Sequence, residues 1–188
     1  MILAKSTLVL TLQNFSNLKM KGKEINEKWI ELLDHTINGL DSDPNFEHYP
    51  IREKSLSFFY TFLFELSKET NIDKIIPSDF QIISPFYKKG IKSLRQEFLV
   101  FFESLIENGL QTGEIKSRAF VSTHYNKLLW QSFLAIILFW YKDKSAQKEQ
   151  TDLFVERVIH LVFDIYAPNA LDASFDLIQF LWKNKLTK

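Results

Sequence analysis

Apolar residues recur every three to four positions along most of this chain, which is the spacing of helices that bury one face. In the first such segment, Ile25, Trp29, Leu32 and Leu33 follow this spacing. The pattern predicts helices over residues 22–40, 50–66, 88–109, 117–142, 151–166 and 169–182. Strand-like alternation of useful length occurs only at Leu8–Leu12, and no internal repeat appears. We therefore expect an all-α fold of about six to seven helices, without a sheet.

Glycine, proline and short hydroxyl side chains mark the expected helix ends. Gly39 and residues 41–45 (DSDPN) stop the first helix, and Pro50 opens the second one in the favoured first turn. Ser117 and Thr151 are the expected N-caps of later helices, because a hydroxyl oxygen accepts a hydrogen bond from an unpaired backbone N–H.

The most apolar stretch of the chain is LLWQSFLAIILFWYKD, residues 128–143. A membrane helix needs about 18 to 20 apolar residues in a row, and this stretch is shorter and is interrupted by Gln131 and Ser132. An ordinary core helix, the wall of a ligand pocket and a subunit interface remain as interpretations. The N-terminal segment lacks the basic region, the long apolar run and the cleavage site of a signal peptide, so we expect a cytoplasmic protein.

The composition narrows the classes of function. The chain has 188 residues, enough for one domain, and its 23 basic residues balance 23 acidic ones, so bulk charge gives no argument for binding nucleic acid or a membrane surface. It has no cysteine, which excludes disulfides, thiolate metal sites and a cysteine nucleophile. Phenylalanine is in excess, with 18 residues. Flat rings would suit a pocket for a large apolar ligand, but a genome that prefers Phe codons explains the excess equally well.

No pattern of titratable residues indicates catalysis. The four histidines lie in four separate segments without metal-ligand spacing, and no phosphate-binding glycine loop or nucleophile motif is present. We expect neither enzyme activity nor a bound metal or cofactor. Glu156, His160 and Asp164 form a polar stripe, four residues apart, on an otherwise apolar helix. A solvent-facing strip is the favoured interpretation, and a polar anchor inside a pocket or a subunit interface is the alternative.

The turn ENGLQTGEI, residues 107–115, connects two predicted helices. Gly109 is expected to take a left-handed C-cap, Gly113 the tight turn, and Glu114 the N-terminus of the following helix. This arrangement resembles the centre of the C-terminal domain of TetR-type transcriptional regulators, where a Gly-x-x-x-Gly-Glu turn commonly joins two helices of the ligand-binding domain. The wider chain is similar to a subfamily of these domains from Bacteroidetes-type bacteria. The resemblance extends over about residues 24–182 and includes residues 29–66, 128–143, 151–167 and 170–182.

This resemblance implies two segments. Residues 1–23 would be a remnant or truncated N-terminal segment, and residues 24–188 a ligand-binding and dimerisation domain. A complete TetR-type regulator carries a three-helix DNA-binding head before this domain, whereas here only residues 6–19 resemble the end of a recognition helix. We therefore expect DNA binding only if a helix-turn-helix is supplied or completed.

The C-terminal helices of TetR-type proteins enclose a mostly apolar pocket, and two long helices pair with their twins in a homodimer. Carried onto this sequence, the resemblance implies a pocket for a hydrophobic small molecule or lipid, lined by Phe59, Phe62, Phe98, Phe102, Trp130 and Phe133. For each of these residues, a packed core ring is the competing interpretation. The pairing helices would be residues 116–142 and 151–167, because a helix that is apolar on nearly every face needs cover on every face. The implied dimer contacts are Ile137, Phe139, Trp140, Tyr141, Phe154, Val158, Leu161 and Val162.

A lipid- or isoprenoid-binding accessory protein is the alternative function. The ubiquinone-pathway protein COQ nine shares a TetR-like fold, and the Phe excess and the incomplete head of the present chain favour a similar role without DNA. In that case the last helix, with Leu171, Phe175 and Ile178 on one side and lysines after it, would make a weak contact with a membrane surface. A helix that closes the core is the competing interpretation of this segment.

Overall fold

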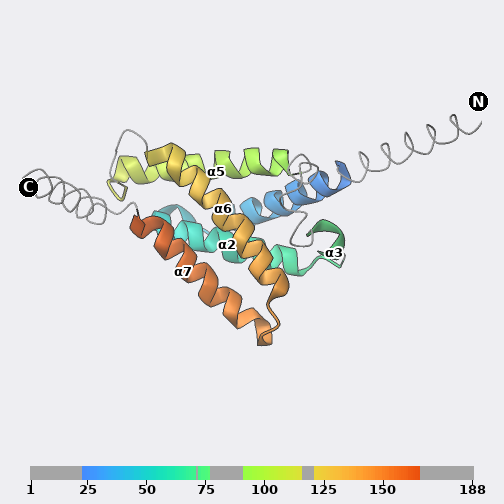
Figure 1. Cartoon of the computed structure of the whole chain (residues 1–188). Helices are drawn as coiled ribbons and strands as arrows, with labels where there is room; N and C mark the ends of the chain where they lie inside the picture. Colours follow the sequence, from blue (N-terminus) through green and yellow to red (C-terminus); the bar gives the residue numbers. More distant parts are fainter. Residues whose placement is uncertain (1–22, 71, 77–90, 116–120, 166–188) are drawn as a thin grey trace, which may run out of the picture.

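The computed structural model describes residues 23–70, 72–76, 91–115 and 121–165, and all regular structure within them is helical. A long helix covers residues 23–41. The elements that follow are η1 (Phe46–His48), α2 (Ile51–Ser67), α3 (Ile72–Ile75), α5 (Lys92–Thr112), α6 (Val121–Lys142), η2 (Ala146–Lys148) and α7 (Glu149–Ile165) (Figure 1). The expectation of an all-α fold is therefore confirmed for the described part of the chain.

Helix α2 makes contacts with α5, α6 and α7. Helix α6 contacts both α5 and α7, and α7 returns from the short turn at residues 143–148 (Figure 1). The helix at residues 23–41 joins this group through Trp29, whose ring stacks on that of Phe62 in α2. Because the helices cross one another around α2, their apolar faces meet in one continuous core.

One of the two glycines near the end of α5 has a different role from the one predicted. The prediction that Gly109 forms a left-handed C-cap is wrong, because α5 continues to Thr112 and Gly113, with a φ of 80°, is the left-handed residue. Gly109 is buried inside the helix, where a Cβ atom would lie 2.8 Å from Ile51 Cδ1. Close packing of α5 against α2 therefore explains the glycine at position 109.

A carboxylate from elsewhere in the chain caps helix α2. Glu114 Oε2 accepts a hydrogen bond of 2.8 Å from the backbone N–H of Ile51, whereas the sequence predicted Glu114 at the start of the helix that follows it. Pro50 stands at the N-cap position, one residue before the helix, and provides no side-chain hydrogen bond. The cap of α2 is thus a tertiary contact with the turn after α5.

Helix α7 also begins differently from the prediction. Thr151 is not its N-cap, because α7 begins at Glu149 and Thr151 is a buried donor within the first turn. Its backbone N–H and its hydroxyl both donate to Asp143 Oδ2, at 2.9 and 2.7 Å.

Ser117 and the helix predicted at residues 169–182 lie outside the described residues. Of the helices that the structure describes, none could cross a lipid bilayer.

Candidate functional site

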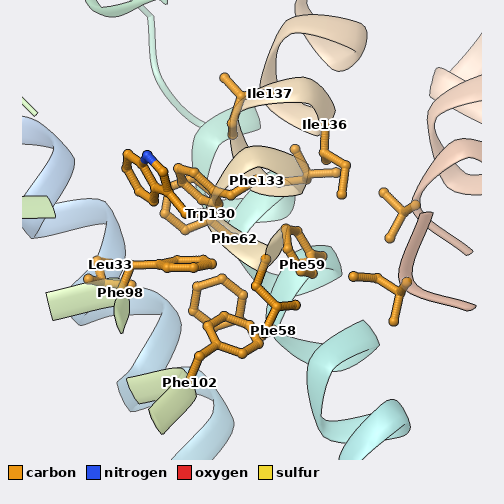
Figure 2. Packing of buried hydrophobic residues seen from close by; sticks show 14 of the residues in the cluster. Leu33, Phe58, Phe59, Phe62, Phe98, Phe102, Trp130, Phe133, Ile136 and Ile137 are labelled. Carbon is orange, nitrogen blue, oxygen red and sulfur yellow. The ribbon is translucent and has the colours of Figure 1, made fainter. Parts of the chain in front are cut away.

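The six aromatic residues that the sequence predicted as pocket lining meet inside the bundle. They come in pairs from three helices, Phe59 and Phe62 from α2, Phe98 and Phe102 from α5, and Trp130 and Phe133 from α6. None of them is more than 5% exposed. The two rings of each pair are three or four residues apart, so they leave the same face of their helix and reach a shared centre (Figure 2). These six residues are called the aromatic cluster below.

The rings of the aromatic cluster contact one another directly. The ring centroid of Phe133 lies 4.9 Å from those of Phe62 and Phe98 and 5.4 Å from that of Trp130. Phe62 meets Phe133 edge to face, whereas Trp130 stacks on Phe133 with 17° between the ring planes. Both geometries are favourable for aromatic pairs. The cluster therefore holds α2, α5 and α6 together as one packed unit.

Three neighbours that the sequence did not assign to the pocket extend the cluster. Phe58 is fully buried, and its ring centroid lies 5.0 Å from that of Phe102 and 5.6 Å from that of Phe98. Leu33 points into the same group (Figure 2), and Trp29, one helical turn earlier, stacks on Phe62. Phe58 had a signal in the sequence, because it precedes Phe62 by four residues on the same helix face. Trp29 and Leu33 had only the apolar periodicity of their helix.

The chemistry of the cluster suits apolar groups. Apart from the indole nitrogen of Trp130, its side chains consist of carbon and hydrogen only, so any partner would be held by burial and ring contacts. An opening between the rings that admits a ligand stays a prediction. A surface depression of about 550 Å³ lies elsewhere, on the helix at residues 23–41. Its described lining residues are Asn26, Glu27, Ile30, Glu31, Asp34, His35 and Asn38.

The eight predicted dimer contacts divide into three groups by their exposure. Three are buried inside the single chain, namely Ile137, Trp140 and Val162. Four are half-buried, namely Phe139, Tyr141, Phe154 and Val158. Leu161 is 59% exposed. Phe139 and Phe154 stack on each other with centroids 4.3 Å apart, which joins α6 to α7 within the chain. Dimerisation stays a prediction, and only the half-buried and exposed residues have surface left for a partner.

The polar stripe of Glu156, His160 and Asp164 is exposed along its whole length, which is the interpretation that the sequence favoured. Arg52 of α2 reaches across to it, with Nη1 3.1 Å from His160 Nδ1 and Nη2 donating to Asp164 Oδ1 at 2.5 Å. Charge pairs as exposed as this one contribute little to stability. Within this chain the stripe is therefore a weak link between α2 and α7 and not a pocket wall.

Among the described residues, the largest pKa shift belongs to Asp143 at the α6–α7 turn, outside the aromatic cluster. Hydrogen bonds from the side chains of Ser145 and Thr151 hold the pKa of Asp143 far below its usual range. Lys148 Nζ donates to the carbonyl oxygens of Trp140 and Asp143, at 2.8 and 2.6 Å, and so satisfies carbonyls at the end of α6. These contacts build a turn. Among the described residues, no three His, Asp or Glu side chains form a metal-binding group.

The fold and its centre define the class of protein, an all-helical bundle around a buried aromatic cluster. A family model described as the Tetracyclin repressor-like, C-terminal domain matches residues 54–181. The chain belongs to this family, whose domains are regulatory, and the resemblance to TetR-type C-terminal domains is confirmed. The matched range contains all six residues of the aromatic cluster. No curated protein and no solved structure matches the chain.

Proposed function

We propose that this chain is the ligand-sensing and dimerising domain of a TetR-type transcriptional regulator, and that it binds an apolar small molecule at the aromatic cluster. The observation that carries the proposal is the meeting of six buried rings from α2, α5 and α6 in a domain of this family. A ligand among these rings would contact three helices at once, so its affinity would depend on how they are arranged. We assign residues 24–188 to this domain and expect it in the cytoplasm.

Such a ligand would act by favouring one arrangement of the helices over another. The helix at residues 23–41 contacts the cluster through the stack of Trp29 on Phe62, whose centroids are 6.1 Å apart with 10° between the ring planes. A second link joins Lys28 Nζ to Glu69 Oε1, just after α2, at 2.8 Å. Displacement of Phe62 would therefore move the helix at residues 23–41 relative to α2. In a complete regulator, this movement would change the spacing of two DNA-reading heads.

We also propose that α6 and α7 provide the dimer face. Leu153 and Leu161 of α7 are 54% and 59% exposed. The half-buried Phe154 and Val158 lie between them in the sequence, at helical spacing to Leu161. A single exposed leucine needs no explanation, but a row of apolar side chains along one helix is what a symmetric partner would cover.

Binding of an apolar fluorescent dye tests the ligand site. We expect the full chain to bind Nile red with an increase in fluorescence, and Phe102→Leu to weaken that binding several-fold. Ile159→Val is the matched control, because Ile159 of α7 is equally buried but lies outside the aromatic cluster. Equal affinities for wild type and both variants would place the dye elsewhere and contradict the proposal.

DNA binding separates the regulator from the lipid-binding accessory protein, since both would use the same apolar cluster. For the regulator, we expect the chain, joined to any in-frame helix-turn-helix encoded upstream, to be retained on DNA from its own upstream region. Retention should fall as the salt concentration rises, because phosphate contacts release counterions. Absence of retention, together with co-purified lipid in native mass spectrometry and binding to liposomes, would instead support the accessory protein.

A further inference from the structure

A row of apolar side chains lies on the outer side of α2. Leu56 is half-buried, Tyr60 is 36% exposed and Phe64 is 61% exposed. Tyr60 and Phe64 are each two residues from the buried Phe62, so they point to the opposite side of the helix from it. The three residues are four positions apart and form one ridge, against which a second helix can pack. Leu56, Tyr60 and Phe64 are called the outer row below.

Three carboxylates at the start of α7 lie beside the outer row. The hydroxyl of Tyr60 donates to the backbone carbonyl oxygen of Asp152 at 3.4 Å, which brings this part of α7 next to the row. Glu149, Asp152 and Glu156 are all exposed there and are called the acidic group. Burial and the nearby carboxylates of Asp143, Glu156 and Glu149 raise the pKa of Asp152. A cation at the acidic group would therefore relieve repulsion between like charges.

The chain leaves α7 at the other end of the outer row. Arg52, at the start of α2, donates a hydrogen bond to Asp164, near the end of α7 (Figure 1). Residues 166–188 lie outside the described residues, and a helix at 169–182, as the sequence predicts, would begin a few residues from this contact. Such a helix spans about 21 Å, and the stretch of α2 from Arg52 to Phe64 spans about 18 Å. The segment is therefore long enough to follow the whole outer row.

The side chains of this segment complement the surface. Its apolar side consists of residues three or four positions apart, namely Leu171, Phe175 and Ile178. Acidic side chains lie in its first half and basic ones follow its end, namely Asp172, Asp176, Lys183, Lys185 and Lys188. A helix that runs along α2 from Arg52 places its aspartates near that guanidinium and the lysines at the acidic group. The opposite orientation would bring like charges together.

We infer that residues 169–182 form a helix that docks on the outer row of its own chain, with the lysines that follow it at the acidic group. The docked helix joins α2, which carries part of the proposed ligand site, to α7, which carries part of the proposed dimer face. It also covers the apolar side that a membrane surface would otherwise contact. The inference does not require a ligand in the aromatic cluster.

Introduced cysteines test the docking, because the chain has no cysteine of its own. Tyr60 and Ile178 lie at about the same distance from Arg52 along their helices in this arrangement. Mild oxidation of the double variant Tyr60→Cys with Ile178→Cys should therefore form a disulfide within one chain, which nonreducing electrophoresis detects. Val100→Cys with Ile178→Cys is the matched control, because Val100 is 62% exposed on α5, a different helix. We expect the first pair to cross-link several-fold faster.

Charge exchange tests the contact with the acidic group. In the wild type, we expect slow hydrogen exchange of the backbone amides at residues 169–182, because a docked helix protects them. Lys183→Glu with Lys185→Glu should speed this exchange several-fold. Adding Glu149→Lys with Glu156→Lys should restore the protection, whereas these two substitutions alone should also speed the exchange. A quadruple variant that exchanges as fast as the two double variants would contradict the pairing.

Four other results would overturn the inference. Fast exchange of residues 169–182 in the wild type would show that no docked helix forms. Protection that appears only with liposomes of phosphatidylcholine and phosphatidylglycerol would assign the segment to a membrane surface. A disulfide between two chains would assign the helix to a second copy of the protein, and equal cross-linking of both cysteine pairs would show that the segment has no fixed place. The wild-type exchange needs no variant, so this test holds even if a substitution prevents folding.

Discussion

The carboxylate of Glu114 accepts a hydrogen bond of 2.8 Å from the backbone N–H of Ile51, so a residue just beyond α5 caps the start of α2. Helix α2 has no side-chain cap of its own, because Pro50 stands at its N-cap. A carboxylate at a helix N-terminus pairs an otherwise unsatisfied N–H and opposes the positive end of the helix dipole. This contact ties together two of the three helices that build the aromatic cluster.

Glu114→Ala is expected to lower the free energy of unfolding by about 1 kcal/mol, which is typical for the loss of a cap. Glu114→Gln should lose less, because its amide oxygen still accepts the hydrogen bond. Urea denaturation measures both values, with Glu107→Ala on the exposed side of α5 as the control. A Glu114→Ala variant as stable as this control would show that the cap contributes nothing.

Gly109→Ala is expected to weaken the contact between α5 and α2. The new Cβ would lie 2.8 Å from Ile51 Cδ1 and 3.1 Å from Ile115 Cδ1. Overpacking costs roughly 1–3 kcal/mol, and the better helix propensity of alanine offsets about 1 kcal/mol of it. We therefore expect a net loss of about 1 kcal/mol in urea denaturation.

Adding Ile51→Val to Gly109→Ala shows whether the contact with Ile51 causes the loss of stability. The valine lacks the Cδ1 methyl group that the new Cβ would meet. The cost of Gly109→Ala should fall in this background. Gly113→Ala gives the contrast, because its cost comes from a φ of 80° with open space around the residue, and Ile51→Val should not relieve it. Equal relief of both alanine variants would rule out a specific clash with Ile51.

Phe98→Ala is expected to lower the free energy of unfolding by about 3–5 kcal/mol, because it removes a fully buried ring and leaves a cavity. Phe64→Ala is the matched control. Phe64 is 61% exposed, and its ring lies under Lys68 Nζ at 4.2 Å, so its removal should cost less than about 1 kcal/mol. Similar losses for the two variants in urea denaturation would contradict the assignment of the cluster as the packed centre.

Asp143→Asn is expected to destabilise the α6–α7 turn in a pH-dependent way. Hydrogen bonds from Ser145 and Thr151 depress the pKa of Asp143 in the folded chain, so its contribution to stability is present above its unfolded pKa of about 3.9. That contribution is lost as the pH falls from there toward the lower folded pKa. The difference in unfolding free energy between wild type and variant should therefore be largest near neutral pH and shrink below about pH 4.

Thermal unfolding at several pH values measures this difference, with Asp34→Asn as an exposed control. A difference for Asp143→Asn that stays constant from neutral to strongly acid pH would show that the charge of Asp143 does not matter to the turn.

Leu161→Glu is expected to convert a dimer of the wild-type chain into a monomer, because it places a charge in the proposed interface between α7 helices. Ile137→Glu would be a poor test, since Ile137 is only 4% exposed and its replacement would bury a carboxylate within the single chain. Val100→Glu is the control, because Val100 is 62% exposed on α5, outside the proposed dimer face. Sedimentation equilibrium gives the mass in solution, and a monomeric wild type would refute the dimer.

The sequence by itself determined the helices and their inner faces. Apolar spacing of three and four residues is a property of a few helical turns, so it placed the helices at residues 51–67, 92–112 and 121–142 within a few residues of their described bounds. The family resemblance, and not the spacing alone, assigned the paired rings of the cluster to a shared centre between three helices.

Only the tertiary structure decided which residues join distant segments. Glu114 and Ile51 are 63 positions apart, and neither the cap between them nor the close approach at Gly109 has a local signal. The sequence assigned Glu114 and Gly109 to local roles in the segment 107–115, because turn chemistry is all that neighbouring residues reveal. Likewise, apolar spacing could not show that Ile137 is buried while Leu161 is exposed. Exposure and pairing depend on what packs against a side chain, and that is settled when the helices come together.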